Sequence, residues 1–205
     1  MTEKEKMLSG KLYDPTDKEL SELRAKAHRL SKMYNDTFED EEEKRSTILK
    51  ELVPNMGKYS GFTGPVYFDY GVFTEIGERF YANFNLTVLD VCPVKIGNDV
   101  MVGPNVSIMT PVHPLRYADR NMRVRENGEL YDLEYGKPIT IGDNCWIAAN
   151  VTITGGVTIG NGCVIGAGSV VTRDIPDNCL AVGNPCRVIR EITDKDDVSL
   201  KEYLW

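Results

Sequence analysis

Aliphatic residues recur at every sixth position through the second half of the chain. From residue 141 the sequence divides without a slip into IGDNCW, IAANVT, ITGGVT, IGNGCV, IGAGSV and VTRDIP. The first position of each hexad is Ile or Val, and the second is Gly, Ala or Thr. Related hexads cover residues 70–93 and 96–107. This repeat is the feature from which the fold can be predicted.

A period of six does not suit an α-helix, because six residues carry the aliphatic positions about 240° around the cylinder. In extended chain six is a multiple of two, so the first position of every hexad faces the same side. The Gly, Asn and Asp residues between them are typical of turns. We therefore expect short strands with a bend every six residues. Three hexads would close one coil, and coils would stack about 4.8 Å apart around a shared core.

Residues 1–60 show helical spacing instead. Asp14-Pro15 is followed by Thr16-x-x-Glu19, which has the form of a capping box. The apolar residues of the first helix then follow at helical spacing, and they are Leu20, Leu23, Ala27, Leu30 and Tyr34. A second helix is expected from Glu39 to Leu52, with Ile48, Leu49 and Leu52 on its apolar side. His28, in the first helix, is interpreted as a surface or packing residue.

The remaining chain divides into two parts. The solenoid is expected to cover residues 61–190. The tail 191–205 is polar and ends in Tyr203-Leu204-Trp205. We expect it to pack over an open coil end, because an unpaired strand edge needs a cover.

The repeat stops between Ser107 and Ile139, which predicts a loop, residues 110–138, extruded from one coil. This segment is charged and contains Gly128 and Gly136. It starts with Thr110-Pro111-Val112-His113-Pro114, which carries one of only two histidines in the chain. Long loops on a rigid scaffold often carry function. From the pattern alone, His113 either performs chemistry or caps a strand, and both alternatives stay open.

Composition narrows the possible partners. The net charge of −7 argues against nucleic acid or an anionic membrane as a general partner. The charged start and the absence of a long apolar run favour a cytoplasmic protein. The five cysteines include no CxxC pair, so we expect reduced thiols rather than zinc or disulfides. Two histidines are too few for a three-histidine zinc site, and no metal is expected.

The motifs taken together resemble the maltose, galactoside and nodulation-factor O-acetyltransferases of the hexapeptide-repeat acyltransferases. TPVHP is similar to their [Thr/Ser]-x-x-His-Pro element. Four further segments extend the resemblance over nearly the whole chain: EKEKMLSGKLY, FYANFNLTVLDVCPVKIG, EYGKPITIG and DIPDNCLAVGNPCRVIREI. The resemblance implies a left-handed parallel β-helix. It also implies acetyl transfer from acetyl-CoA to a sugar hydroxyl, in a homotrimer with sites between subunits.

The resemblance assigns catalytic roles. His113 is implied as the general base that takes the proton of the sugar hydroxyl, a task imidazole performs near neutral pH. Glu134, in EYGKP, would orient its ring, and Glu129, in NGELY, is the rival for that role. Asn83, in YANFN, would bind the reacting hydroxyl, and a backbone N–H near Ala149 would stabilise the oxyanion. A covalent acetyl-enzyme is disfavoured, since no cysteine has an evident activator.

Acceptor and coenzyme residues follow in the same way. Asp17 and Arg24 match the acidic and basic pair on the first helix of the maltose enzyme, with Pro15 as the alternative alignment for the acid. Asp69 matches an aspartate of the maltose enzyme, and Val91 replaces a second acid of the galactoside enzyme. A maltose- or glucose-type acceptor is therefore expected. The positions matched to coenzyme contacts are Trp146, Ala149, Ala167, Thr172, Arg173, Arg187 and Arg190.

Three alternatives remain. The first is the same chemistry on a galactoside, an amino sugar, serine or a xenobiotic alcohol. The second is a non-catalytic binding or scaffolding solenoid, which predicts no turnover of acetyl-CoA. The third is a zinc carbonic anhydrase of the same solenoid type, which the shortage of histidines argues against.

Overall fold

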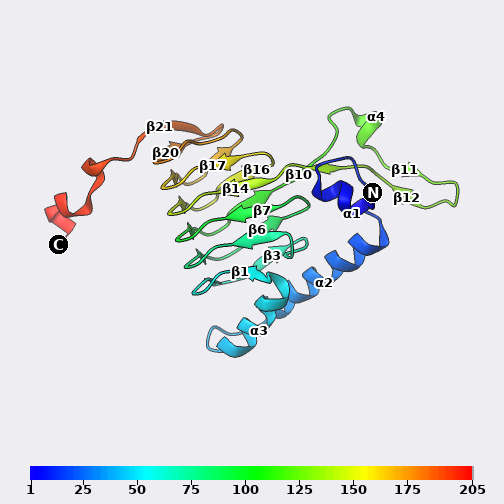
Figure 1. The fold of residues 1–205 in the computed structure, drawn as a ribbon, viewed down its shortest axis with the longest axis horizontal. Coiled ribbons are helices and arrows are strands. Elements are labelled where there is room, and N and C mark those ends of the chain that lie inside the picture. The colour runs from blue at the N-terminus through cyan, green and yellow to red at the C-terminus, as the bar shows by residue number, and fades with distance from the viewer. Residues whose placement is uncertain (205) are drawn as a thin grey trace.

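Three parallel sheets form the walls of a solenoid in the computed structural model, which describes residues 1–204 (Figure 1). The first sheet contains β1 (Asn55–Met56), β4 (Thr74–Ile76), β7 (Val94–Ile96), β14 (Ile139–Ile141) and β17 (Thr158–Ile159). The second contains β2 (Gly61–Phe62), β5 (Tyr81–Ala82), β8 (Met101–Val102), β15 (Trp146–Ile147), β18 (Val164–Ile165), β20 (Cys179–Val182) and β21 (Arg187–Glu191). The third contains β3 (Val66–Phe68), β6 (Leu86–Leu89), β9 (Ser107–Met109), β16 (Thr152–Thr154) and β19 (Val170–Val171). The predicted parallel β-helix is confirmed, and its first coil starts at Asn55, before the expected boundary at residue 61.

The first position of each hexad fills the core, as the period predicts. These side chains are at most 1% exposed, and they are Ile141, Ile147, Ile153, Ile159, Ile165 and Val171. Successive coils place them above one another; Ile141, for example, pairs with Ile96 on one side and Ile159 on the other. Each fully buried aliphatic side chain contributes about 1.5–3 kcal/mol to folding. The shared core therefore holds the coils together.

Asparagines shape one corner of the solenoid. Asn85, Asn105 and Asn150 have φ values of 60°, 59° and 57°, in the left-handed region that asparagine tolerates better than most residues. The side-chain amide of Asn85 donates to Asn105 at 3.0 Å, and the amide of Asn105 donates to Asn150 at 3.1 Å. These side chains form a ladder across three coils. Asparagine at this bend therefore supplies both the turn conformation and contacts between coils.

Three helices precede the solenoid: α1 (Glu3–Leu8), α2 (Lys18–Asn35) and α3 (Glu42–Leu52). The expected capping box at Thr16 is wrong. Asp17 caps α2, since its carboxylate accepts from Leu20 N at 3.3 Å, whereas the Thr16 hydroxyl donates to Asp14. Helix α3, which was predicted to begin at Glu39, begins at Glu42. The preceding turn is closed by a hydrogen bond from Phe38 N to the side chain of Glu41.

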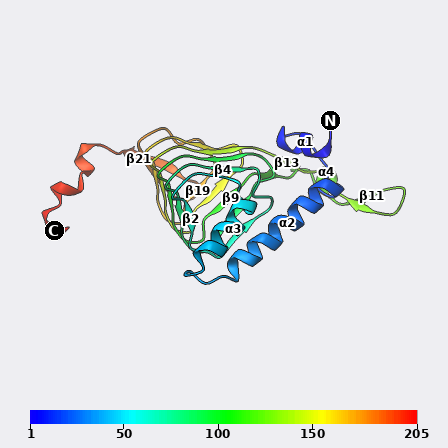
Figure 2. The same cartoon turned by 60° about the horizontal axis from the view of Figure 1, so that its bottom comes forward.

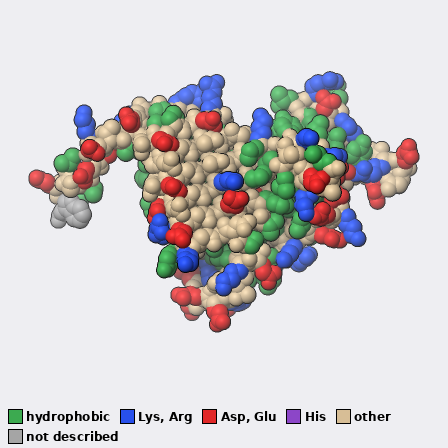
Figure 3. Space-filling view, viewed as in Figure 1, with side chains coloured by type: hydrophobic (Ala, Val, Ile, Leu, Met, Phe, Trp, Pro, Cys, Tyr) green, Lys and Arg blue, Asp and Glu red, His purple; other side chains and the backbone are tan. Residues whose placement is uncertain are grey.

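Helices α2 and α3 cover the open first coil. Figure 2 shows α3 over this end of the solenoid and α2 running along its side. Tyr34, Leu49 and Leu52 join the same buried cluster as Phe62 and Phe68. In Figure 3, hydrophobic side chains gather where the N-terminal helices meet the solenoid. The helical segment thus completes the core at this end.

The segment expected as a loop is a structured insertion, residues 110–138. β10 (Pro111–Val112) pairs antiparallel with β13 (Tyr135–Gly136), and a bond of 3.0 Å from Lys137 N to Thr110 O closes the base. Beyond this base lie α4 (Tyr117–Arg120) and a hairpin of β11 (Arg123–Val124) and β12 (Leu130–Tyr131). Arg125 pairs with Asp14 and lies 4.3 Å from the centre of the Tyr131 ring. The insertion is therefore tied to the N-terminal segment.

The end of the chain differs from the expectation. β21 pairs antiparallel with β20 and covers the open edge of the second sheet. After Ile192 the chain leads away from the solenoid in three short turns, η1 (Asp194–Asp196), η2 (Val198–Leu200) and η3 (Glu202–Leu204) (Figure 1). The backbone groups at this edge already pair with β21, so residues 193–204 do not pack over it. Trp205 lies outside the described residues. None of the helices described in residues 1–204 is long and apolar enough to span a membrane.

Candidate active site

His113 and Glu134 face each other at the base of the insertion. His113 follows β10 and Glu134 precedes β13, so the antiparallel pairing of these strands brings the two residues together. Nε2 of His113 lies 3.5 Å from Oε2 of Glu134. The histidine side chain is 46% exposed, whereas the glutamate side chain is only 14% exposed. A mostly buried carboxylate thus faces an imidazole that solvent and ligands can reach.

Tyr13 holds the other carboxylate oxygen of Glu134. Its hydroxyl donates to Oε1, and its backbone N–H donates to the Glu134 carbonyl at 3.0 Å. Tyr13 is completely buried. Burial, opposed by the bond from Tyr13 and the charge of His113, raises the pKa of Glu134. Burial and the neighbouring carboxylate raise the pKa of Tyr13, so the tyrosine stays a protonated donor.

A second group of polar residues lies beside this pair. Arg24 donates to the hydroxyl of Tyr70 at 3.2 Å and to the carbonyl of Pro15 at 3.3 Å. Burial raises the pKa of Tyr70 to about 12, although Arg24 opposes the shift. Burial also raises the pKa of Asp69, opposed by His28, whose Nε2 lies 3.5 Å from Oδ1 of Asp69. The charge of Asp69 also influences Glu134, so both groups share one electrostatic environment.

Asp17 and Glu129 have described contacts with residues other than His113. Asp17 caps α2, and its described contact is with the helix backbone rather than with His113. Glu129 is exposed in the hairpin of the insertion, where it accepts from Asn127 at 2.9 Å. Of the two glutamates, Glu134 is therefore the one beside His113.

Asn83 lies at another corner of the solenoid. It sits between β5 and β6, where the second sheet turns into the third, and its side chain accepts from Phe84 N at 2.8 Å. His113 lies where the third sheet turns into the first. The strand residues of β9 alone, Ser107–Met109, span about 10 Å between these corners. One chain therefore does not bring Asn83 and His113 together.

The predicted coenzyme residues are spread over two corners and one wall. Trp146 is 50% exposed on the outer face of the second sheet. Ala149 and Ala167 follow strands of that sheet, where it turns into the third. The exposed residues Thr172 and Arg173 follow β19, where the third sheet turns into the first.

Two further predicted coenzyme residues lie on β21. Arg187 donates to the carbonyl of Cys186 at 2.7 Å and is otherwise exposed. Both terminal nitrogens of Arg190 bond the carboxylate of Asp196, each at 2.7 Å. Planar guanidinium groups bind the oxygens of carboxylates and phosphates in this paired manner. The exposed arginines of this region therefore fit a phosphate-bearing ligand, and Arg190 already holds a carboxylate.

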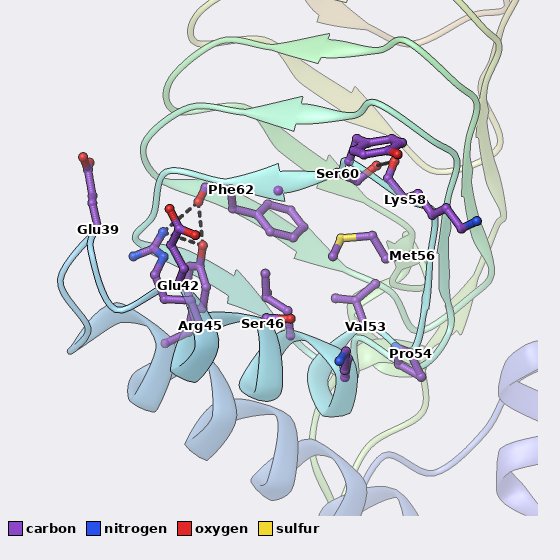
Figure 4. Close-up of a pocket in the computed structure, with 16 residues that line it drawn as sticks. Glu39, Glu42, Arg45, Ser46, Val53, Pro54, Met56, Lys58, Ser60 and Phe62 are labelled. Carbon is purple, nitrogen blue, oxygen red and sulfur yellow. Dashed lines mark hydrogen bonds between the residues drawn. The ribbon is translucent and has the colours of Figure 1, made fainter.

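Several cavities lie near the helices. One, of about 470 Å³, lies between α3 and the first coil (Figure 4). Met56 and Phe62 point into it, and Arg45 bridges to the Phe62 carbonyl at 2.8 Å. None of the predicted site residues lines it. Another, of about 460 Å³, lies between α2 and the third sheet and is lined in part by His28 and Asp69.

The structure describes no metal centre. Within residues 1–204, no three His, Cys, Asp or Glu side chains lie together as metal ligands do. The five cysteines are all buried and unbridged.

Tyr13 was not predicted as a site residue, although it is the last residue of the segment EKEKMLSGKLY that resembles the family.

The chain is similar to proteins of known chemistry over nearly its full length. The family model described as maltose acetyltransferase hexapeptide capping motif matches residues 6–57, and bacterial transferase hexapeptide (six repeats) matches residues 138–173. Galactoside O-acetyltransferase of Escherichia coli (strain K12) is 44% identical, over 94% of this chain and 90% of its own length.

Solved structures give the same result. A maltose O-acetyltransferase from Clostridium difficile 630 is 48% identical, with a TM-score of 0.85 over 95% of this chain and 99% of its own. A galactoside acetyltransferase in complex with coenzyme A is 44% identical, with a TM-score of 0.86 over 96% of this chain and 94% of its own. Both solved structures therefore match this chain in fold and in length.

Proposed function

Because this chain belongs to the sugar O-acetyltransferases of the hexapeptide-repeat family, we propose that it acetylates a maltose- or glucose-type sugar with His113 as the general base. It is an O-acetyltransferase that uses acetyl-CoA. The observation that carries the proposal is the row of three side chains, Tyr13, Glu134 and His113, in which only the histidine is open to a ligand.

The proposed mechanism is direct attack. Nε2 of His113 faces Glu134, which leaves Nδ1 free to take the proton of the sugar hydroxyl as its oxygen attacks the thioester carbonyl. The C–S bond then breaks, and His113 returns the proton to the leaving thiolate. Glu134 stabilises the imidazolium between these steps, and Tyr13 keeps the carboxylate in place. No cysteine is needed, since burial raises the pKa of Cys92, Cys145 and Cys163 away from the reactive thiolate form.

The acceptor type is inferred from two positions. Asp69 supplies a carboxylate beside the candidate site, next to Arg24 and His28. Val91 is only 3% exposed and packs with Tyr13, so this position offers no acid to an acceptor. Both features support a maltose- or glucose-type acceptor. A galactoside is the alternative acceptor, since a relative of that name is 44% identical.

We propose that the complete site forms between subunits of a homotrimer. Asn83 and His113 lie at different corners of one chain, so joining them requires two chains. The outer face of the second sheet carries an exposed apolar row of Tyr81, Met101 and Trp146, paired in register. Apolar rows of this kind mark contact surfaces. A closed three-fold ring would bury the row and set Asn83 of one subunit beside His113 of the next.

The coenzyme residues are proposed on the same basis. Arg173 and Arg187 are exposed and suit the phosphates of acetyl-CoA, because guanidinium groups bind phosphate oxygens in pairs. Ala149 and Ala167 have side chains too small to cover the backbone beside them, which leaves room for the pantetheine arm. Trp146, on the outer face of its sheet, would form one wall of the acetyl channel.

The test is thiol release from acetyl-CoA with maltose, glucose and an alkyl galactoside. We expect sugar-dependent turnover in the wild type, with maltose or glucose preferred, and a fall of about 10²–10⁴-fold in kcat for His113→Ala. Glu129→Gln, in the same insertion, is the matched control and should keep wild-type kcat. Full activity of His113→Ala would exclude the histidine as base. A wild type that acetylates none of the sugars would exclude the acceptor.

A further inference from the structure

A cavity of about 460 Å³ lies between α2 and the outer face of the third sheet. This volume is within the range of about 300–1,000 Å³ that small-molecule sites occupy. Helix α2 contributes His28, Ser31 and Lys32 to its lining, and the sheet contributes Tyr67, Asp69 and Leu89. Of these residues, only Asp69 belongs to the proposed acceptor site.

The cavity adjoins the acceptor site. Asp69 lines it and also acts electrostatically on Glu134 and Tyr70. Arg24, which bonds the Tyr70 hydroxyl, comes four residues before His28 on α2, so both face the same side of the helix about 6 Å apart along its axis. Figure 1 shows α2 running from the insertion toward α3. The cavity therefore lies next to the proposed acceptor residues Arg24 and Asp69.

The lining combines an apolar surface with polar groups. Tyr67 is 49% exposed on the outer face of β3, and Leu89 lies one coil further, beside Asp69. His28 and Lys32 place polar groups at the helix side. A pyranose ring has matching surfaces, a face of C–H groups and a rim of hydroxyls. Sites with an apolar wall and a few polar groups bind such ligands specifically.

Ser31 adds a group that the protein itself does not satisfy. The residue is only 4% exposed, and its hydroxyl has no hydrogen-bond partner within residues 1–204. Buried hydroxyl groups almost always have a partner, so an unpaired one in a cavity wall needs an explanation. Ser31 lines the cavity, but its oxygen is almost completely buried, so a rotation of the side chain is what would bring the hydroxyl to a ligand there.

We propose that this cavity is a second sugar subsite, which holds the ring next to the one that is acetylated. The inference rests on the proposed sugar acetyltransferase activity and makes it more specific. Disaccharides such as maltose fill both subsites, whereas a methyl glucoside fills only the subsite beside His113. The enzyme therefore discriminates by acceptor length through residues that do not contact the reacting hydroxyl.

The test is a comparison of acceptors in the Tyr67→Ala variant. We expect the KM for maltose to rise about ten-fold, the effect of losing one good contact, with kcat unchanged. The KM values for methyl α-glucoside and for acetyl-CoA should stay at wild-type levels. Tyr67→Phe keeps the ring and should keep the wild-type KM for maltose. Tyr59→Ala, an exposed tyrosine that does not line this cavity, is the matched control.

The possible outcomes separate the two proposals. A wild-type KM for maltose in a folded Tyr67→Ala variant overturns the second subsite and leaves the acetyltransferase activity intact. An equal rise in KM for maltose and methyl α-glucoside also overturns it, because Tyr67 would then act on the ring that reacts. If the wild type acetylates neither sugar, the proposed function fails, and the second subsite fails with it.

Discussion

Glu134 has a different partner on each of its two oxygens. Oε1 accepts from the buried hydroxyl of Tyr13, and Oε2 lies 3.5 Å from His113. The first contact fixes the carboxylate, and the second presents its charge to the imidazole. In the proposed mechanism Glu134 is therefore a positioning residue that acts through His113.

We predict that Glu134→Gln lowers kcat by on the order of 10–100-fold, less than the loss of the base itself. Glutamine keeps the size of the side chain but not the charge that stabilises an imidazolium. Steady-state kinetics with maltose measure the effect. Glu134→Asp keeps the charge and should recover part of the activity. Wild-type kcat in Glu134→Gln would show that the carboxylate has no role.

The direction of the Glu134 pKa shift predicts how activity and stability depend on pH. Burial raises the pKa of Glu134 above its usual value, so protonation removes its charge at a higher pH than in an exposed glutamate. The acid limb of kcat/KM in the wild type should therefore include a step that Glu134→Gln lacks, measured by pH profiles of both proteins. For stability, the raised pKa favours the protonated native state. This contribution is present at low pH and is lost as pH rises through the pKa of the folded state.

The elements differ in how far the sequence predicts them. The six-residue period predicts the strands and their buried positions, because each Ile or Val must face the same core. The starts of the helices were predicted less well, because Asp17 and Glu41 fix them through local bonds to the backbone. Tyr13 was missed entirely, since no local pattern indicates that its hydroxyl reaches a residue 121 positions later.

The C-terminal segment, residues 193–204, leads to a prediction about coenzyme binding. Asp196 bonds both terminal nitrogens of Arg190, an arginine that the family resemblance matches to a coenzyme contact. The carboxylate and a phosphate would compete for the same guanidinium. We therefore predict that Asp196→Asn lowers the KM for acetyl-CoA by about two- to five-fold, as suits an exposed pair, with a smaller difference at high salt.

The neighbouring aspartate is the matched control for the tail. Asp197 accepts from Ser199 N at 2.8 Å and caps η2, so Asp197→Asn should keep the wild-type KM. A higher KM for acetyl-CoA in Asp196→Asn would contradict the competition. It would indicate instead that Asp196 holds Arg190 in the orientation that binds the coenzyme.

The whole molecule has three unlike walls. The outer row of the first sheet is polar, with Glu75 beside Lys95 and then Thr140. The outer row of the second sheet is apolar, and the third sheet is partly covered by α2. The sequence and its family resemblance allow the fold, the reaction and the Glu134–His113 pair to be predicted, but not the corner of the solenoid that each site residue occupies. Asn83 and His113 are the clearest example, because successive coils of one chain hold them on different corners.

We predict that two inactive variants restore activity when they assemble together. Asn83→Ala and His113→Ala each remove one half of a site proposed to form between subunits. In randomly mixed trimers roughly a quarter of the sites combine an intact Asn83 with an intact His113. Co-refolding followed by the acetyl-transfer assay measures this recovery, and light scattering measures the trimer mass. No recovery in mixed trimers would place both residues in a site within one chain.

The closed base of the insertion separates the catalytic pair, His113 and Glu134, from the rest of the inserted segment. The chain leaves the solenoid at Thr110 and returns at Lys137, and the β10–β13 pair joins the two points before α4 and the hairpin begin. The segment from Pro114 to Asp132 can therefore change in length or sequence without shifting a coil or parting His113 from Glu134. In evolution or in the laboratory, such a segment can be exchanged as a cassette. The catalytic pair stays unchanged in such an exchange.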